Sequence, residues 1–236
     1  MAFENLIGNE KIKSLLTSAV QANNVLHSYL FVGIQGIGKS LFAKEFAQMI
    51  LCTSNQEKPC KTCKSCLEFQ GDSHPDFLQI EPEDGKTIKI EQIRYLQEKI
   101  AEKPVTSEKK VYIIEDCDKM TREAANGLLK TLEEPPSYAV LILITTNESK
   151  LLATIKSRCT KIAFQSLLEE EVKTYLKTQD NERSMTSHML KQCQGSIGML
   201  IKIGEEQEAY TQIENVINNI KKEDITQIWK KAEVLY

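Results

Sequence analysis

The sequence has no long hydrophobic run and little excess charge of either sign. None of its apolar runs reaches the roughly 18 residues that a membrane-spanning helix needs. The N-terminus also lacks the charged and apolar regions of a secretory signal peptide, so we expect a cytoplasmic protein with no membrane contact. A formal net charge of -3 over 236 residues gives no global electrostatic reason for tight, autonomous DNA binding.

The cysteines are odd in number, seven in all, which argues against a framework of paired disulfides in a chain of this size. Four of them form a C-x7-C-x2-C-x2-C cluster at Cys52, Cys60, Cys63 and Cys66. Two-residue spacers let a tight turn aim neighbouring sulfurs at one ion, and four thiolates suit a closed tetrahedral site. We therefore expect a structural zinc ion there, with unpaired thiols as the alternative.

The remaining cysteines have no ligand spacing and are expected to be ordinary buried thiols; they are Cys117, Cys159 and Cys193. His74 lies close to the cluster in sequence, but four sulfurs already complete a zinc site. We expect this histidine to be a hydrogen-bonding residue of a loop.

Strand and helix patterns alternate over the first two thirds of the chain. Strands are predicted at residues 28–32, 111–114 and 139–144, as short apolar runs typical of strands buried on both faces. Helices are predicted at residues 8–24, 39–50 and 121–134. This alternation predicts an α/β fold with a mainly parallel sheet flanked by helices. Strand signals end near Gln165, so residues 1–165 are expected to form one domain and residues 166–207 a small helical one.

A phosphate-binding loop is the strongest motif. Gly33 to Ser40 match G-x-x-x-x-G-K-[ST] between a predicted strand and a predicted helix, which is the context that the motif requires. Gly33, Gly36 and Gly38 let the backbone curl so that its N–H groups point at phosphate oxygens. Lys39 would reach the β- and γ-phosphates and Ser40 would bind Mg²⁺, so ATP with Mg²⁺ is the expected ligand.

An acidic pair follows the predicted strand at residues 111–114. P-loop enzymes carry a carboxylate at the end of a neighbouring strand to hold Mg²⁺, and here Glu115 and Asp116 stand at that place. The usual order in AAA+ proteins is Asp then Glu, and this pair is inverted. Glu115 is one methylene longer than the usual first residue, and Asp116 is one methylene shorter than the usual second residue. Catalysis depends on placement of these carboxylates within about an ångström, so the inversion would spoil the catalytic geometry. Binding would survive while hydrolysis would fail; a solvated acidic loop without a catalytic role is the alternative.

These motifs together resemble the bacterial clamp-loader subunits of the AAA+ family. The resemblance covers residues 3–165 and, more weakly, the chain to about residue 205. Residues 120–136, MTREAANGLLKTLEEPP, are its most specific piece. The inserted zinc module also resembles that of the bacterial subunits. The resemblance implies an AAA+ P-loop domain with a zinc module at about residues 52–66, a helical lid at residues 166–207, and the start of a helical collar at residues 208–236 that looks truncated.

The same resemblance implies roles for three further residues. Ile7 lies in a segment similar to the adenine-side segment of the family. Thr146 is at the sensor-1 position, where a polar side chain at a strand end faces the γ-phosphate; ordinary turn chemistry is the alternative. Arg158 lies in an SRC motif, and the arginine of that motif reaches into the nucleotide site of a neighbouring subunit as an arginine finger.

Two kinds of subunit share this fold. The inverted acidic pair, and Gly198 where a motor subunit carries the sensor-2 arginine, favour the delta-prime subunit of DNA polymerase III over a gamma/tau motor that hydrolyses ATP itself. The expected partners are then gamma/tau and delta subunits in a hetero-pentamer, the sliding clamp, and primer-template DNA through the complex. Weak or absent solitary ATPase is expected. A stand-alone P-loop enzyme and a purely structural scaffold are the alternatives from other classes.

Overall fold

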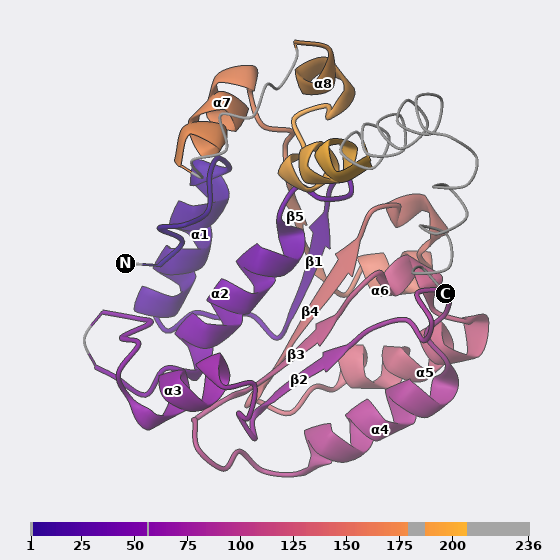
Figure 1. The fold of residues 1–236 in the computed structure, drawn as a ribbon. Helices are drawn as coiled ribbons and strands as arrows, with labels where there is room; N and C mark the ends of the chain where they lie inside the picture. Colours follow the sequence, from indigo (N-terminus) through magenta and orange to yellow (C-terminus); the bar gives the residue numbers. More distant parts are fainter. Residues whose placement is uncertain (1, 56, 179–186, 207–236) are drawn as a thin grey trace, which may run out of the picture.

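The computed structural model describes residues 2–55, 57–178 and 187–206. Its centre is a five-stranded, fully parallel sheet with the strand order β2-β3-β4-β1-β5 (Figure 1). The strands are β1 (Ser28–Val32), β2 (Phe77–Ile80), β3 (Lys110–Ile114), β4 (Ala139–Thr145) and β5 (Thr160–Ala163). The predicted fold class, a parallel sheet flanked by helices, is confirmed.

Helices cover both faces of the sheet. They are α1 (Glu10–Gln21), α2 (Lys39–Leu51), α3 (Lys64–Gln70), α4 (Ile90–Ala101), α5 (Arg122–Glu133), α6 (Ala153–Lys156), α7 (Glu169–Thr178) and α8 (Ser187–Gln192), with a further helical stretch over residues 197–206. Figure 1 shows α1 and α2 on one side of the sheet and α4 and α5 on the other. Connections of this kind between parallel strands are typical of α/β domains.

The core has two layers because the side chains of each strand alternate between faces. Along β4, Val140, Ile142 and Ile144 pack toward α1 and α2, whereas Leu141 and Leu143 pack toward α4 and α5. All seven residues of β4 are buried, which explains why its sequence is a continuous apolar run rather than an alternating one.

Local signals fix the ends of the helix that carries the most specific motif. The Thr121 hydroxyl accepts a hydrogen bond from Ala124 N–H at 3.2 Å and caps α5, and Pro135 and Pro136 follow its end. Ala124, Leu128 and Leu132 are buried against the sheet. The helix is therefore explained by core packing alone, apart from any function.

The helices α7 and α8 and residues 197–206 follow the last strand, β5. The domain boundary near residue 165 remains a prediction, and the expected collar at residues 208–236 lies outside the described residues. Over the part of the chain that the structure describes, no helix has the length and apolar character needed to cross a membrane.

Candidate functional site

The phosphate loop joins β1 to α2, as the motif predicts. Gly38 precedes α2 with φ 97°, a left-handed conformation that favours glycine. The Lys39 ammonium donates to the carbonyls of Gly33 at 2.8 Å and Ile34 at 2.9 Å, so the side chain lies along the loop. Burial lowers the pKa of Lys39, against the attraction of the acidic residues after β3. A buried, charged group held in a glycine loop can meet the charge of a phosphate.

One carboxylate of the acidic pair meets this loop. The Ser40 hydroxyl donates to Glu115 Oε2 at 2.8 Å, and burial raises the pKa of Glu115. We had expected the phosphate loop and the acidic pair to follow adjacent strands. They follow β1 and β3, and β4 lies between these two strands. The hydrogen bond nevertheless shows that the Glu115 side chain is directed at Ser40, the residue expected to bind Mg²⁺.

The second carboxylate is held elsewhere. Asp116 has φ 44°, and its Oδ2 forms an ion pair with Lys119 Nζ at 2.8 Å. A left-handed backbone at a non-glycine residue is uncommon, and here it turns the side chain toward its own 3₁₀ segment (Cys117–Lys119). Glu115 and Asp116 thus have different partners.

The end of β4 has a polar contact that the sequence reasoning missed. Thr145 is fully buried, and its hydroxyl donates to Asp118 Oδ1 at 2.5 Å. Thr146, the expected sensor-1 residue, is the next residue along and is exposed. A buried threonine at the last position of a strand, with an acidic residue near the end of another strand, is the signal that could have indicated this pair. Ile7, the expected adenine-side residue, is half-buried before α1.

Arg158 lies at the molecular surface with a third of its side chain exposed. Its guanidinium forms an ion pair with Glu133 Oε1 at 2.7 Å and donates to the Thr154 carbonyl at 2.9 Å. Its own carbonyl accepts a hydrogen bond from the Ser28 hydroxyl at 2.6 Å. Ser28 is the first residue of β1, whereas the phosphate loop follows the last, so Arg158 and the loop are at opposite ends of this strand.

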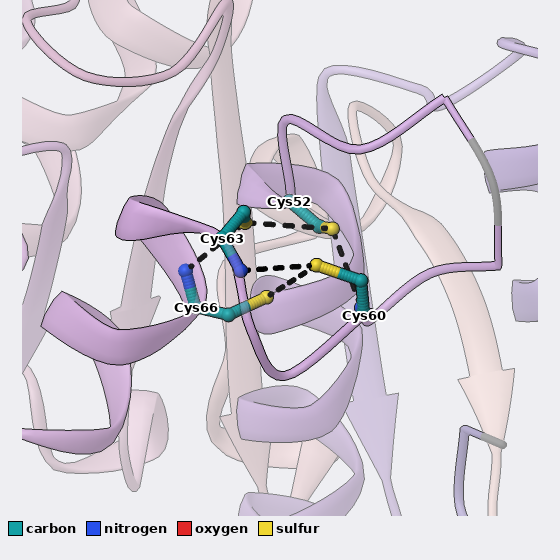
Figure 2. Close-up of side chains that lie close together, drawn as sticks. All are labelled: Cys52, Cys60, Cys63 and Cys66. Carbon is teal, nitrogen blue, oxygen red and sulfur yellow. Dashed lines mark hydrogen bonds between the residues drawn. The ribbon is translucent and has the colours of Figure 1, made fainter.

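The four clustered cysteines come together (Figure 2). Their four sulfur atoms all lie within 4.8 Å of one another, with Cys52 and Cys63 at 3.9 Å and Cys60 and Cys66 at 4.0 Å. Four sulfurs around a zinc ion at about 2.3 Å stand roughly 3.8 Å apart in a tetrahedron. Hydrogen bonds from the backbone of Thr62 and Cys63 lower the pKa of Cys60 to about 5. The cluster can therefore supply the donor set of a metal ion.

A buried hydrogen-bond network fastens this cluster to the sheet. His74 Nε2 lies 2.9 Å from Ser65 Oγ and 3.3 Å from Ser107 Oγ, and both hydroxyls donate to the Leu51 carbonyl at 2.7 Å. His74 Nδ1 accepts from Asp76 N–H at 3.0 Å, so Nε2 carries the proton of the neutral ring. His74 is a hydrogen-bonding residue as expected, yet it is buried. The spacing of the serines gives no sequence signal for the network.

The other cysteines differ in burial. Cys117 and Cys193 are buried, as expected for ordinary thiols. Cys159 is only half-buried, and burial raises its pKa to about 11. A thiol that stays protonated at neutral pH is a weak nucleophile.

The strand order, the loop after β1 and the acidic end of β3 define a P-loop nucleotide-binding fold of the AAA+ class. The RuvB Holliday junction branch migration motor of Thermotoga maritima has the same fold, with a TM-score of 0.57 at 16% identity over 88% of this chain and 64% of that one. Likeness at this level of identity concerns the fold alone.

The chain belongs to the family described as DNA polymerase III, delta subunit, whose sequence model matches residues 8–168. The DNA polymerase III subunit delta' of Bacillus subtilis is 38% identical over 170 residues, which are 72% of this chain and 51% of the relative. The subunit tau/gamma of Haemophilus influenzae is 34% identical over 202 residues, or 83% of this chain and 29% of the relative. The chain thus spans about half of the first relative and less than a third of the second.

Proposed function

We propose that this chain is a clamp-loader subunit of the delta-prime type, which helps to load the sliding clamp onto primed DNA and lends Arg158 to a neighbouring ATPase subunit. Its relatives are subunits of DNA polymerase III named delta' and tau/gamma. The partners would be gamma/tau and delta subunits in a hetero-pentamer, the clamp, and primer-template DNA reached through the complex, in the bacterial cytoplasm.

The position of Arg158 is the observation that carries the proposal. The Ser28 hydroxyl holds its backbone at the start of β1, and the phosphate loop begins at Gly33, five residues on. At about 3.3 Å per strand residue, that separation is roughly 16 Å. The guanidinium also points to Glu133 on α5 rather than along β1. An arginine so placed suits the nucleotide site of another subunit better than its own.

The nucleotide site favours binding over hydrolysis. Lys39 would hold the phosphates, and Ser40 with Glu115 would hold Mg²⁺, whose charge offsets that of the phosphates. Asp116, the second carboxylate of the pair, forms an ion pair with Lys119 and is therefore not placed to orient an attacking water. Ile7 and Thr146 remain proposed contacts to the adenine and to the γ-phosphate. The chain alone is therefore expected to turn over ATP slowly or not at all.

The Cys52, Cys60, Cys63 and Cys66 cluster is proposed to hold a structural zinc ion. The sulfur separations of 3.9 and 4.0 Å support it, because they fit the edges of a zinc–sulfur tetrahedron. Four thiolates leave no open position on the ion, so the ion would order the loop and take no part in the reaction.

Two other functions have specific support or a specific obstacle. A gamma/tau motor is favoured by the intact phosphate loop and by the 34% identity to tau/gamma. A stand-alone P-loop enzyme would supply its own arginine to the transferred phosphoryl group. Arg158, the arginine of the SRC motif, lies at the far end of β1 from the phosphate loop, and this position does not suit that role.

A nucleotide titration and an ATPase assay of the isolated chain separate these functions. We expect a fluorescent ATP analogue to bind with Mg²⁺, and Lys39→Ala to weaken binding at least about tenfold by removing a charge-assisted contact. Lys11→Ala, at an exposed lysine of α1, is the matched control. Turnover of about 1 per second or more would identify a motor subunit. A wild-type chain that binds no nucleotide would contradict the proposed binding site.

A further inference from the structure

Residues at the start of the helical stretch 197–206 form hydrogen bonds with backbone carbonyls of the phosphate loop. Gly198 N–H donates to the Gly36 carbonyl at 3.0 Å, and the Ser196 hydroxyl donates to the Gln35 carbonyl at 2.8 Å. Ser196 is buried, and its Oγ also accepts from Met199 N–H at 3.1 Å, which caps the stretch. We call this set of bonds the glycine contact. Figure 1 draws residues 197–206 in yellow beside the end of β1.

There is no room for a side chain in the glycine contact. A Cβ atom added at Gly198 would lie 2.7 Å from Gly36 Cα and 3.1 Å from the Gly36 carbonyl oxygen. A Cβ atom at Gly36, which has φ +74°, would in turn lie 2.9 Å from Gly198 Cα. Two glycines therefore permit an approach that any other pair would prevent. Gly198 stands where a motor subunit carries the sensor-2 arginine. Besides lacking that side chain, it allows the backbone of the helical stretch to contact the phosphate loop.

The contact sets the direction of two peptide groups in the loop. In a trans peptide the carbonyl and the following N–H point in opposite directions. Since the carbonyls of Gln35 and Gly36 are bonded to residues 196 and 198, the N–H groups of Gly36 and Ile37 point away from them. These N–H groups belong to the loop that would bind phosphate. The helical stretch thus orients donors of the phosphate loop.

A second set of bonds holds the same segment from the other side. Leu167 N–H donates to the Gly195 carbonyl at 3.1 Å. Gly195 has φ +75°, and a Cβ atom added there would lie 2.3 Å from the Leu167 carbonyl oxygen. The chain just before Leu167 is tied to Asn9 by two hydrogen bonds between the Asn9 side chain and the Gln165 backbone, at 2.9 and 3.2 Å. Every one of these bonds joins protein atoms, so none of them needs a phosphate.

We propose that residues 195–206 are fastened to the phosphate loop by the glycine contact whether or not nucleotide is bound, so that nucleotide does not move them. A ligand shifts a conformational equilibrium only through its differential affinity for the two states. A segment already held by bonds between protein atoms gives a nucleotide little with which to shift it. The proposal goes beyond the clamp-loader function and does not depend on it.

Hydrogen exchange of the full chain, followed by mass spectrometry, tests the glycine contact. Wild type should exchange slowly over residues 197–206, at rates that agree within about twofold with and without Mg²⁺ and an ATP analogue. Gly198→Ala should exchange at least about fivefold faster, because overpacking must push the segment off the loop.

Gly204→Ala is the matched control, because a Cβ atom there meets nothing within 4 Å. Helix propensity alone favours alanine over glycine at both positions. Faster exchange than wild type in Gly198→Ala, without faster exchange in Gly204→Ala, would therefore indicate a steric contact at Gly198. Exchange over β1 and β4 in the same spectra reports whether the sheet remains folded. If Gly198→Ala disturbs the sheet, Ser196→Ala decides, because it removes the hydroxyl donor and adds no atom.

Two outcomes would overturn the proposal. One is exchange over residues 197–206 that is fast without nucleotide and slows only when nucleotide is added. The other is a Gly198→Ala protein, or a Ser196→Ala protein where that variant decides, that exchanges as slowly as wild type. A chain that binds no nucleotide in the separate titration would count against the proposed function, while the comparison of the variants without nucleotide would still test the contact.

Discussion

Replacing Asp76 by Asn should destabilise the fold strongly, although the change alters one atom. Asp76 is buried just before β2, and its carboxylate accepts three backbone hydrogen bonds. The bond from Val105 N–H goes to Oδ1, and those from Thr106 and Ser107 N–H go to Oδ2, each at 2.8 Å. These bonds hold the segment that leads into β3.

The magnitude follows from what an asparagine can still accept. Its single oxygen can keep the pair of donors at Oδ2, which leaves its NH₂ group facing Val105 N–H. An unsatisfied buried donor costs about 1–3 kcal/mol, and the two remaining bonds each lose about 0.5–1.5 kcal/mol of charge assistance. Because these donors are only partly buried, water offsets some of the loss, and we expect about 2–4 kcal/mol.

Urea unfolding followed by circular dichroism measures this change. Asp72→Asn is the matched control, because Asp72 is exposed and its φ of 50° suits asparagine. We expect Asp72→Asn to stay within about 0.5 kcal/mol of wild type. An Asp76→Asn protein that unfolds at the same urea midpoint as wild type, with the same slope, would refute the reasoning.

Three further predictions concern the metal cluster, its network and the nucleotide site. Burial lowers the pKa of His74, so the folded protein favours the neutral ring. The free energy of unfolding should therefore fall by up to about 1 kcal/mol as pH drops from 7 to 5.5. In thermal unfolding, His74→Gln should lose this pH dependence, whereas His27→Gln, at an exposed histidine, should keep it. Cys66→Ser should abolish metal retention measured by elemental analysis, whereas Cys193→Ser should retain it. Glu115→Gln should weaken Mg²⁺-dependent nucleotide binding by roughly tenfold without changing the free energy of unfolding by more than about 0.5 kcal/mol. Equal binding by variant and wild type would remove Glu115 from the magnesium site.

The strands that sequence reasoning predicted are those buried on both faces. β1, β3 and β4 lie inside the sheet, so all but an end residue of each strand is apolar. β2 and β5 lie at the edges and are short, and three of the four residues of β5 are exposed. Their pairing is fixed by the neighbouring strand rather than by a pattern of their own, which is why neither was predicted.

The candidate site shows the same division between local and long-range information. The phosphate loop and the cysteine cluster are local in sequence, so spacing alone indicated them. Contacts between distant segments gave no such signal: Arg158 pairs with Glu133, and Gly198 packs on Gly36. The turn of Asp116 toward Lys119 depends on a left-handed backbone angle, which the residue type permits and does not dictate.

The ATPase rate of a reconstituted clamp loader, with this chain in the delta-prime position beside gamma/tau and delta subunits, tests the central claim most directly. Arginine fingers contribute about 10³–10⁵-fold to the turnover at one site, so Arg158→Ala should remove the share of DNA-stimulated turnover that the adjoining site supplies. Arg94→Ala, at an exposed arginine of α4, should not change it. A chain that does not join the complex, or an Arg158→Ala complex as active as wild type, would contradict the account.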